Sequence, residues 1–145
     1  MNFMEARVAN RREDMPTIAA MIDRFAAAHR LSRAELHDLH VAMDEILTNI
    51  IAYAYEEGRL GEILVRLTYH TSEVLADVED NGRPFDPTQF PAPDLRRALR
   101  ERKVGGMGIH FARSLMDDLV YSRAGGKNRL RLRKTLTRTP PGLSE

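Results

Sequence analysis

The chain has 145 residues, of which 43% are apolar and 30% charged, and this balance predicts one compact domain, residues 1–145, with one hydrophobic core. Because the sequence contains no cysteine, disulfides, thiolate zinc sites and cysteine nucleophiles are excluded. The net charge of +1 gives no overall electrostatic reason for the chain to bind nucleic acid or an anionic membrane.

The sequence has no stretch that predicts a membrane span or a secretory signal. No apolar run approaches the roughly 20 residues that a spanning helix needs, and residues 1–7 lack the apolar segment of a signal peptide. We therefore expect a cytoplasmic protein without a membrane partner. Residues 138–145 are expected to form a disordered tail.

The N-terminal part of the chain predicts a strand followed by a helix. After the strand, which reaches residues 8–10, Asp14 can cap a helix that has Pro16 in its first turn. The helix is expected to end near His29. Its apolar residues at helical spacing are Ile18, Met21, Ile22 and Phe25.

A second helix is predicted to begin at Ser32 and to end near Tyr55. Ser32 and Glu35 have the spacing of a capping box, in which each side chain bonds the other residue's backbone N–H. One face of this helix is apolar and wide enough to pack on a sheet. Its members are Leu36, Leu39, Met43, Ile46, Leu47, Ile50 and Ala54.

The C-terminal half predicts strands, a long loop and one more helix. Two strands, 62–69 and 74–78, are expected to pair as a hairpin, and the loop that follows contains four prolines between Gly82 and Gly106. A third helix fits residues 109–116, and two final strands fit 118–123 and 127–136, with a turn at Gly125-Gly126 between them. This order predicts an α+β fold, a two-layer sandwich with a mixed or antiparallel sheet and three helices on one face.

The first candidate motif lies in the second helix, where Glu45 and Asn49 are four residues apart. This spacing puts both side chains on one helix face, which we expect to point away from the apolar stripe. An amide oxygen beside a carboxylate suits Mg²⁺, which takes oxygen ligands and keeps waters and nucleotide phosphates in its shell. Taken alone, the pair is a weak signal and is more typical of an ordinary solvated face.

The second motif is the sequence 78–86, VEDNGRPFD, in which an apolar strand leads into an acidic turn. A carboxylate such as Asp80 at a strand end can accept a hydrogen bond from the exocyclic amine of adenine. Gly82 lets the backbone approach a ring or a phosphate closely. By itself the tripeptide Asp-Asn-Gly is also the usual sequence of a tight turn.

The third motif is a run of glycines before the third helix. Free N–H groups and the positive end of the helix dipole favour phosphate at such a helix start, although a lone glycine cluster is often a simple loop. The sequence has no Walker-type GxxxxGK[ST] spacing. The run comprises Gly105, Gly106 and Gly108, followed by Ile109.

Together and in this order, the three motifs resemble the N, G1 and G2 boxes of the Bergerat-fold ATPases, the GHKL superfamily of gyrase, Hsp90, histidine kinases and MutL. The likeness covers most of the chain. Within the superfamily, the short length, the Phe85-Asp86 pair and residues 115–118 running on to 128–130 look most like the serine/threonine kinases that act as anti-sigma factors in partner-switching systems.

The resemblance implies a role for each motif in binding ATP and Mg²⁺. Asn49 would hold the Mg²⁺ that bridges the phosphates. Asp80 would accept from the adenine amine, and Gly82 would line the same pocket. The glycine run with Ile109 would wrap the phosphates beneath a lid formed by residues 86–104. Arg100 and Lys103 are candidate lid cations, with solvated charges as the alternative.

Glu45 would be the general base that takes the proton from a serine or threonine hydroxyl. The implied partners are an anti-anti-sigma protein of the STAS class, which is the substrate, and a sigma factor. A homodimer is also implied. A histidine kinase proper would need a preceding phospho-accepting helix pair, for which the roughly 35 residues before Leu36 leave no room.

Two other functions remain open at this stage. The first is a non-enzymatic, nucleotide-gated switch that sequesters a regulatory partner, against which the presence of Glu45 argues mildly. The second is nucleic-acid binding by Arg129, Arg131 and Arg133, which alternate with leucines on the last strand. The alternative for these arginines is a solvated outer face. The five histidines show no metal-like clustering.

Overall fold

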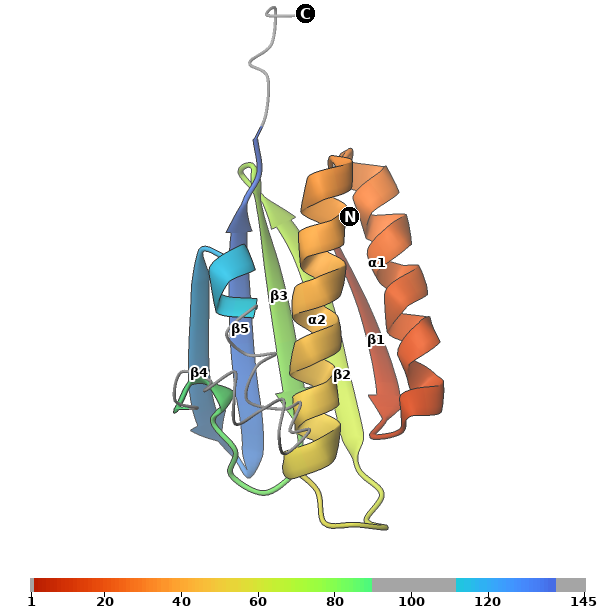
Figure 1. Cartoon of the computed structure of the whole chain (residues 1–145), viewed down its shortest axis with the longest axis vertical. Coiled ribbons are helices and arrows are strands. Elements are labelled where there is room, and N and C mark those ends of the chain that lie inside the picture. Colours follow the sequence, from red (N-terminus) through yellow and green to blue (C-terminus); the bar gives the residue numbers. More distant parts are fainter. Residues whose placement is uncertain (1, 90–111, 138–145) are drawn as a thin grey trace, which may run out of the picture.

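The computed structural model describes residues 2–89 and 112–137, and these form a sheet covered on one face by helices (Figure 1). The sheet has five strands in the order β1-β2-β3-β5-β4, and every neighbouring pair is antiparallel. The predicted two-layer α+β fold is confirmed. The elements are β1 (Phe3–Ala9), α1 (Met15–His29), α2 (Arg33–Tyr53), β2 (Glu62–His70), β3 (Glu73–Asp80), β4 (Asp118–Ala124) and β5 (Lys127–Thr135), with 3-10 turns at Arg12–Asp14 and Pro87–Gln89.

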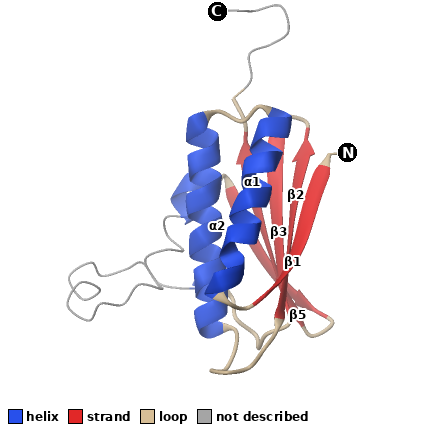
Figure 2. Ribbon diagram, turned by 90° about the vertical axis from the view of Figure 1, so that its right-hand side faces the viewer, coloured by secondary structure: helices blue, strands red, loops and turns tan. Residues whose placement is uncertain are grey.

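Turned by 90°, the molecule shows its two layers edge on, with α1 and α2 side by side on the sheet (Figure 2). The core lies between the layers because alternate strand residues face the helices. No helix in the described part of the chain is both long and apolar enough to cross a membrane. The fully buried members of the three central strands include Ile63, Val65, Leu67, Ala76 and Leu132.

The opposite face of the sheet carries the arginines of β5, each within ion-pair distance of an acid on β3. The pairs are Arg129–Glu79 at 3.5 Å, Arg131–Asp77 at 2.7 Å and Arg133–Glu73 at 3.7 Å. Exposed pairs of this kind stabilise a fold by about 1 kcal/mol at most. Because each arginine meets an acid, the strand forms a charge-balanced outer face, and this geometry favours the solvated alternative over a nucleic-acid surface.

Helix α1 runs from Met15 to His29 as predicted, but the expected cap at its start is wrong. Asp14 occupies the N-cap position without bonding the helix N–H groups. Its carboxylate instead accepts a hydrogen bond from the backbone N–H of Ala9, at the end of β1, at 3.1 Å. Asp14 therefore joins the strand to the helix that follows it.

Helix α2 has the predicted capping box. The Ser32 hydroxyl accepts from Glu35 N–H at 3.1 Å, and Glu35 Oε1 accepts from Ser32 N–H at 2.8 Å. The second oxygen of Glu35 accepts from Thr137 N–H at 2.8 Å, so this buried carboxylate also fixes the segment after β5. The helix ends at Tyr53, slightly before the predicted end.

The remaining predicted elements are confirmed where the structure describes them. Both hairpins have nearly the predicted bounds. Residues 112–115 are helical and belong to the predicted third helix, whose start lies outside the described residues. The same holds for most of the predicted lid and for the tail beyond residue 137.

Replacing the capping serine provides a test of the α2 start. We expect Ser32→Ala to lower the free energy of unfolding by about 1 kcal/mol, because one helix N–H loses its acceptor. Urea denaturation followed by circular dichroism measures this change. Ser122→Ala on the exposed face of β4 is the control, and equal midpoints for the two variants would contradict the role of the cap.

Candidate functional site

Asp80 is the last residue of β3 and lies on the face of the sheet that packs against the helices. The side chain is buried, with 3% of the residue exposed. Its Oδ1 accepts hydrogen bonds from Gly82 N–H and from the Asn128 side chain, both at 2.9 Å. Oδ2 accepts no hydrogen bond from the residues that the structure describes. The carboxylate therefore keeps one oxygen available to a ligand.

Burial raises the pKa of Asp80 above its ordinary value, and the hydrogen bonds from Asn128 and Gly82 oppose this rise. A buried carboxyl without donors would tend to become neutral, whereas donors favour the charged form. The two hydrogen bonds therefore help to keep Asp80 an acceptor.

Gly82 lies directly against the end of α2. A Cβ atom at this position would be 2.3 Å from the carbonyl oxygen of Ala54, a distance that no side chain can tolerate. Next in the chain, Arg83 donates from its backbone N–H to Ala54 O at 2.8 Å and from its Nε to Tyr53 O at 2.9 Å. These bonds satisfy carbonyl groups at the helix end. They join the turn after Asp80 to α2.

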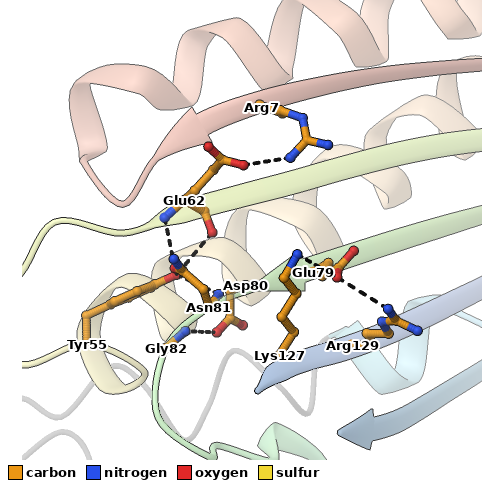
Figure 3. Close-up of polar contacts among 9 residues, drawn as sticks. All are labelled: Arg7, Tyr55, Glu62, Glu79, Asp80, Asn81, Gly82, Lys127 and Arg129. Atoms are coloured by element: carbon orange, nitrogen blue, oxygen red, sulfur yellow. Dashed lines mark hydrogen bonds and ion pairs between the residues drawn. The ribbon is translucent and has the colours of Figure 1, made fainter. Parts of the chain in front are cut away.

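A second connection between the same segments centres on Tyr55 and Asn81 (Figure 3). The Tyr55 hydroxyl lies 2.9 Å from Asn81 Oδ1 and accepts from Asn81 N–H at 3.2 Å. Asn81 Oδ1 also accepts from the backbone N–H of Glu62 at the start of β2, at 2.9 Å. The end of α2, the start of β2 and the end of β3 are thus bonded to one another.

Asn49 is buried, with 1% exposed, so the prediction that its helix face points away from the core is wrong in this respect. Residues seven apart on a helix are separated by only about 20°, and Ala42 is also buried. The buried arc of α2 therefore extends beyond the apolar stripe and includes Asn49. Its Nδ2 has no hydrogen-bond partner in the described part of the chain.

Glu45 precedes Asn49 by four residues, which is about 6 Å along the helix axis, and its side chain is half-buried. Burial raises the pKa of Glu45, and the neighbouring negative charge of Asp44 raises it further. A carboxylate with a raised pKa is a better proton acceptor than an ordinary surface acid.

The residues present fit a magnesium nucleotide. Buried amides normally have hydrogen-bond partners, so the unpartnered Nδ2 of Asn49 suits a ligand, and rotation of the amide would present its oxygen at the same place. The described residues contain no group of three or more carboxylates and histidines that could hold a metal ion. Mg²⁺ commonly needs only one or two protein ligands, with phosphates and waters completing its shell.

The third motif cannot be placed in the same way. Gly105, Gly106, Gly108 and Ile109 lie outside the described residues, as do the candidate lid cations Arg100 and Lys103. The helix that follows is described from residue 112, and its end is fixed. Lys134 Nζ donates to Leu115 O at 2.9 Å and pairs with Asp38 of α2 at 3.0 Å.

Comparison with known proteins identifies the family of this chain. Residues 8–134 match the family model of the histidine kinase-like ATPase domain. The serine/threonine-protein kinase BtrW of Bordetella bronchiseptica is 35% identical over 78% of this chain and 75% of its own length. The chain belongs to the family of the histidine kinase-like ATPase domain, among its serine/threonine-protein kinases.

Other relatives support the same assignment, and the resemblance predicted from the sequence is confirmed. The serine-protein kinase RsbW of Bacillus subtilis is 26% identical over 86% of the chain and 81% of its own length. An anti-sigma F factor of Caldanaerobacter subterraneus is 26% identical over 89% of the chain and 90% of its own length. A crystal structure of the RsbU and RsbW domains of Rv1364c from Mycobacterium tuberculosis shares the fold, with a TM-score of 0.69 and 16% identity. The structural match includes 99% of the present chain and 35% of the longer mycobacterial chain.

Asn128 belongs to this candidate site but was not predicted from the sequence, which indicated only that it lies in the last strand, directly after the turn at Gly125-Gly126. Asn128 is buried, with 3% exposed, and lies opposite Asp80 in the β3–β5 register. A signal for it exists in the sequence. Asn128 shares its strand face with Leu130 and Leu132, so it is a polar residue at a position where the alternation predicts burial.

Tyr55 provides a test of the connection between α2 and the end of β3. Burial raises the pKa of its hydroxyl to about 12, compared with 10.0 in the absence of the fold. A group with a raised pKa in the folded state stabilises the fold fully below its unfolded pKa and loses this effect as the pH approaches the folded value. We expect Tyr55→Phe to cost about 1–2 kcal/mol at neutral pH.

The difference from wild type should then shrink as the pH rises from about 10 to about 12. Urea denaturation at several pH values measures it. Tyr53→Phe, which removes a hydroxyl from a more exposed ring of α2, is the control. A wild-type advantage that stays constant through this pH range would contradict the role of the Tyr55 hydroxyl.

Proposed function

We propose that this kinase transfers the γ-phosphoryl group of magnesium ATP to a serine or threonine of a STAS-domain anti-anti-sigma protein, and that it sequesters a sigma factor. The observation that carries the proposal is the carboxylate of Asp80, of which only Oδ1 accepts hydrogen bonds from the described residues. The turn that follows Asp80 is hydrogen-bonded to the end of the helix that carries Glu45 and Asn49. We thereby assign base recognition to Asp80 and phosphoryl transfer to Glu45 and Asn49, on a strand end and a helix that these hydrogen bonds hold together.

In this proposal each motif has one task. Oδ2 of Asp80 accepts from the adenine amine, and Gly82 lines the same pocket. Asn49 lies about 7.5 Å along the helix axis from the Ala54 carbonyl that contacts Gly82, and it holds Mg²⁺ through its amide oxygen. Gly105, Gly106, Gly108 and Ile109 wrap the phosphates.

Magnesium ATP supplies the phosphoryl group, with its charge partly neutralised by the metal. Glu45 accepts the proton of the substrate hydroxyl while the hydroxyl oxygen forms its bond to phosphorus and ADP leaves. The half-buried position of Glu45 supports this role, because its raised pKa lies closer to the working pH than that of a solvated acid.

The partners follow from the relatives, among which are anti-sigma F factors and serine-protein kinases. The names of these relatives support a sigma factor and an anti-anti-sigma protein as partners. We propose in addition that the anti-anti-sigma protein has a STAS domain. We also propose that the kinase works in the cytoplasm as a homodimer.

Intact-mass spectrometry provides the test of transfer. We expect one STAS protein from the same genome to gain a phosphate from purified kinase and magnesium ATP. Glu45→Ala should abolish the transfer while changing the Kd for ATP by less than about threefold, since the base touches only the reacting hydroxyl. Transfer that persists in this variant would contradict the assignment of Glu45.

Asp44→Ala is the matched control on the same helix, and it also predicts a pH effect. The Asp44 charge raises the pKa of Glu45, so its removal should lower that pKa. The base is active when deprotonated, and the rate should therefore rise with pH at a lower pH in Asp44→Ala than in wild type. Single-turnover rates measured between pH 5 and pH 8 give the profile, and an unshifted or oppositely shifted limb would refute the coupling.

A further inference from the structure

Asn128 makes five hydrogen bonds, which together leave its amide one orientation. Its Oδ1 accepts from three donors, and its Nδ2 donates to Asp80 Oδ1 at 2.9 Å and to Arg83 O at 2.8 Å. The donors to Oδ1 are Phe85 N–H at 3.3 Å, the Tyr121 hydroxyl and the Arg123 guanidinium at 2.9 Å.

Turning this amide over would set its NH₂ group against those three donors and its oxygen against Arg83 O. The Tyr121 hydroxyl could turn to accept from the NH₂ group, but the contacts with Phe85 N–H, the Arg123 guanidinium and Arg83 O would each place like groups together, at a high cost in free energy. Asn128 therefore always offers a donor to Asp80. Gly82 N–H offers a second donor to the same Oδ1 atom.

We propose that Asn128 determines base specificity by positioning Asp80: it keeps Oδ1 occupied as an acceptor, so that Oδ2 is the oxygen that selects a 6-amino purine over a 6-oxo purine. This inference rests on the proposed role of Asp80 in base recognition. Asn128 acts through Asp80 and is a positioning residue.

The arrangement predicts what Asp80→Asn does. The two donors from Asn128 and Gly82 require an oxygen at the Oδ1 position, so the new amide must place its NH₂ group at the Oδ2 position. A donor then faces the base where an acceptor was. This polarity repels the amine of adenine and suits the 6-oxo group of inosine.

Isothermal titration calorimetry with magnesium ATP and magnesium ITP measures this selectivity. Wild type should bind ATP at least about 100-fold more tightly than ITP, because a 6-oxo group leaves two acceptors facing each other. Asp80→Asn should bind ITP more tightly than ATP. Ser122→Ala, on the exposed face of β4 and outside this network, should retain the wild-type preference.

The exchanged pair, Asp80→Asn with Asn128→Asp, tests Asn128 itself. The carboxylate at position 128 places one oxygen against Arg83 O, which costs stability. Its charge nevertheless attracts the NH₂ group of the new amide more strongly than the Gly82 N–H attracts the amide oxygen, since charged hydrogen bonds are the stronger ones. The amide oxygen then faces the base, and the preference for ATP should recover at least about tenfold relative to Asp80→Asn. Should the exchanged pair not fold, Asn128→Ser should lower the wild-type preference about tenfold.

The outcomes separate the two proposals. If Asp80→Asn binds ATP as wild type does, the proposed base-binding role of Asp80 fails. If Asp80→Asn weakens ATP without favouring ITP, the role stands and the orientation by Asn128 is overturned. A folded exchanged pair that still prefers ITP, or an Asn128→Ser variant with unchanged selectivity, also overturns it.

Discussion

The contact of Gly82 with the last carbonyl groups of α2 is the constraint on which the rest of the site depends. A Cβ atom there would collide with Ala54 O. Without this approach, Arg83 could not bond Ala54 O and Tyr53 O. The helix with Glu45 and Asn49 and the strand end with Asp80 would then no longer share a fixed geometry. One glycine thus couples the carboxylate proposed for base recognition to the helix that carries the proposed catalytic residue.

Most of the fold could be predicted from the sequence, since it depends on local periodicity. Alternating residues gave both hairpins, and Ser32 with Glu35 gave the start of α2. The two errors concern side chains whose surroundings are set by segments outside their own helix. Asp14 bonds β1 instead of its own helix. Asn49 lies on a helix flank whose burial depends on tertiary packing, and a helical stripe defines only the centre of the buried arc.

The candidate site could be predicted only in part, because motifs give residue types and order while hydrogen bonds between strands set their orientation. Asp80 and Glu45 were predicted as site residues from their motifs. Asn128 was not, because its importance comes from standing between Asp80 and Arg123 in the registers of three neighbouring strands. Only the strand pairing, which is non-local, puts these three side chains in one row.

Charged side chains are exposed on the outer face of the sheet, whereas the few polar side chains between the sheet and the helices are buried. This difference in burial explains where chemistry can occur. On the outer face the arginines of β5 meet the acids of β3 in water, where such pairs change little. On the inner face of the described residues only Glu35, Asn49, Asp80 and Asn128 are buried and polar. Glu35 is fully used in holding α2 and the segment after β5. Asn128 is likewise saturated by the network around Asp80. What remains are one oxygen of Asp80, which no described residue bonds, and Nδ2 of Asn49, which is buried without a partner among the described residues. Because burial makes an unmet hydrogen bond costly, the Asn49 amide gives a ligand the strongest reason to bind there.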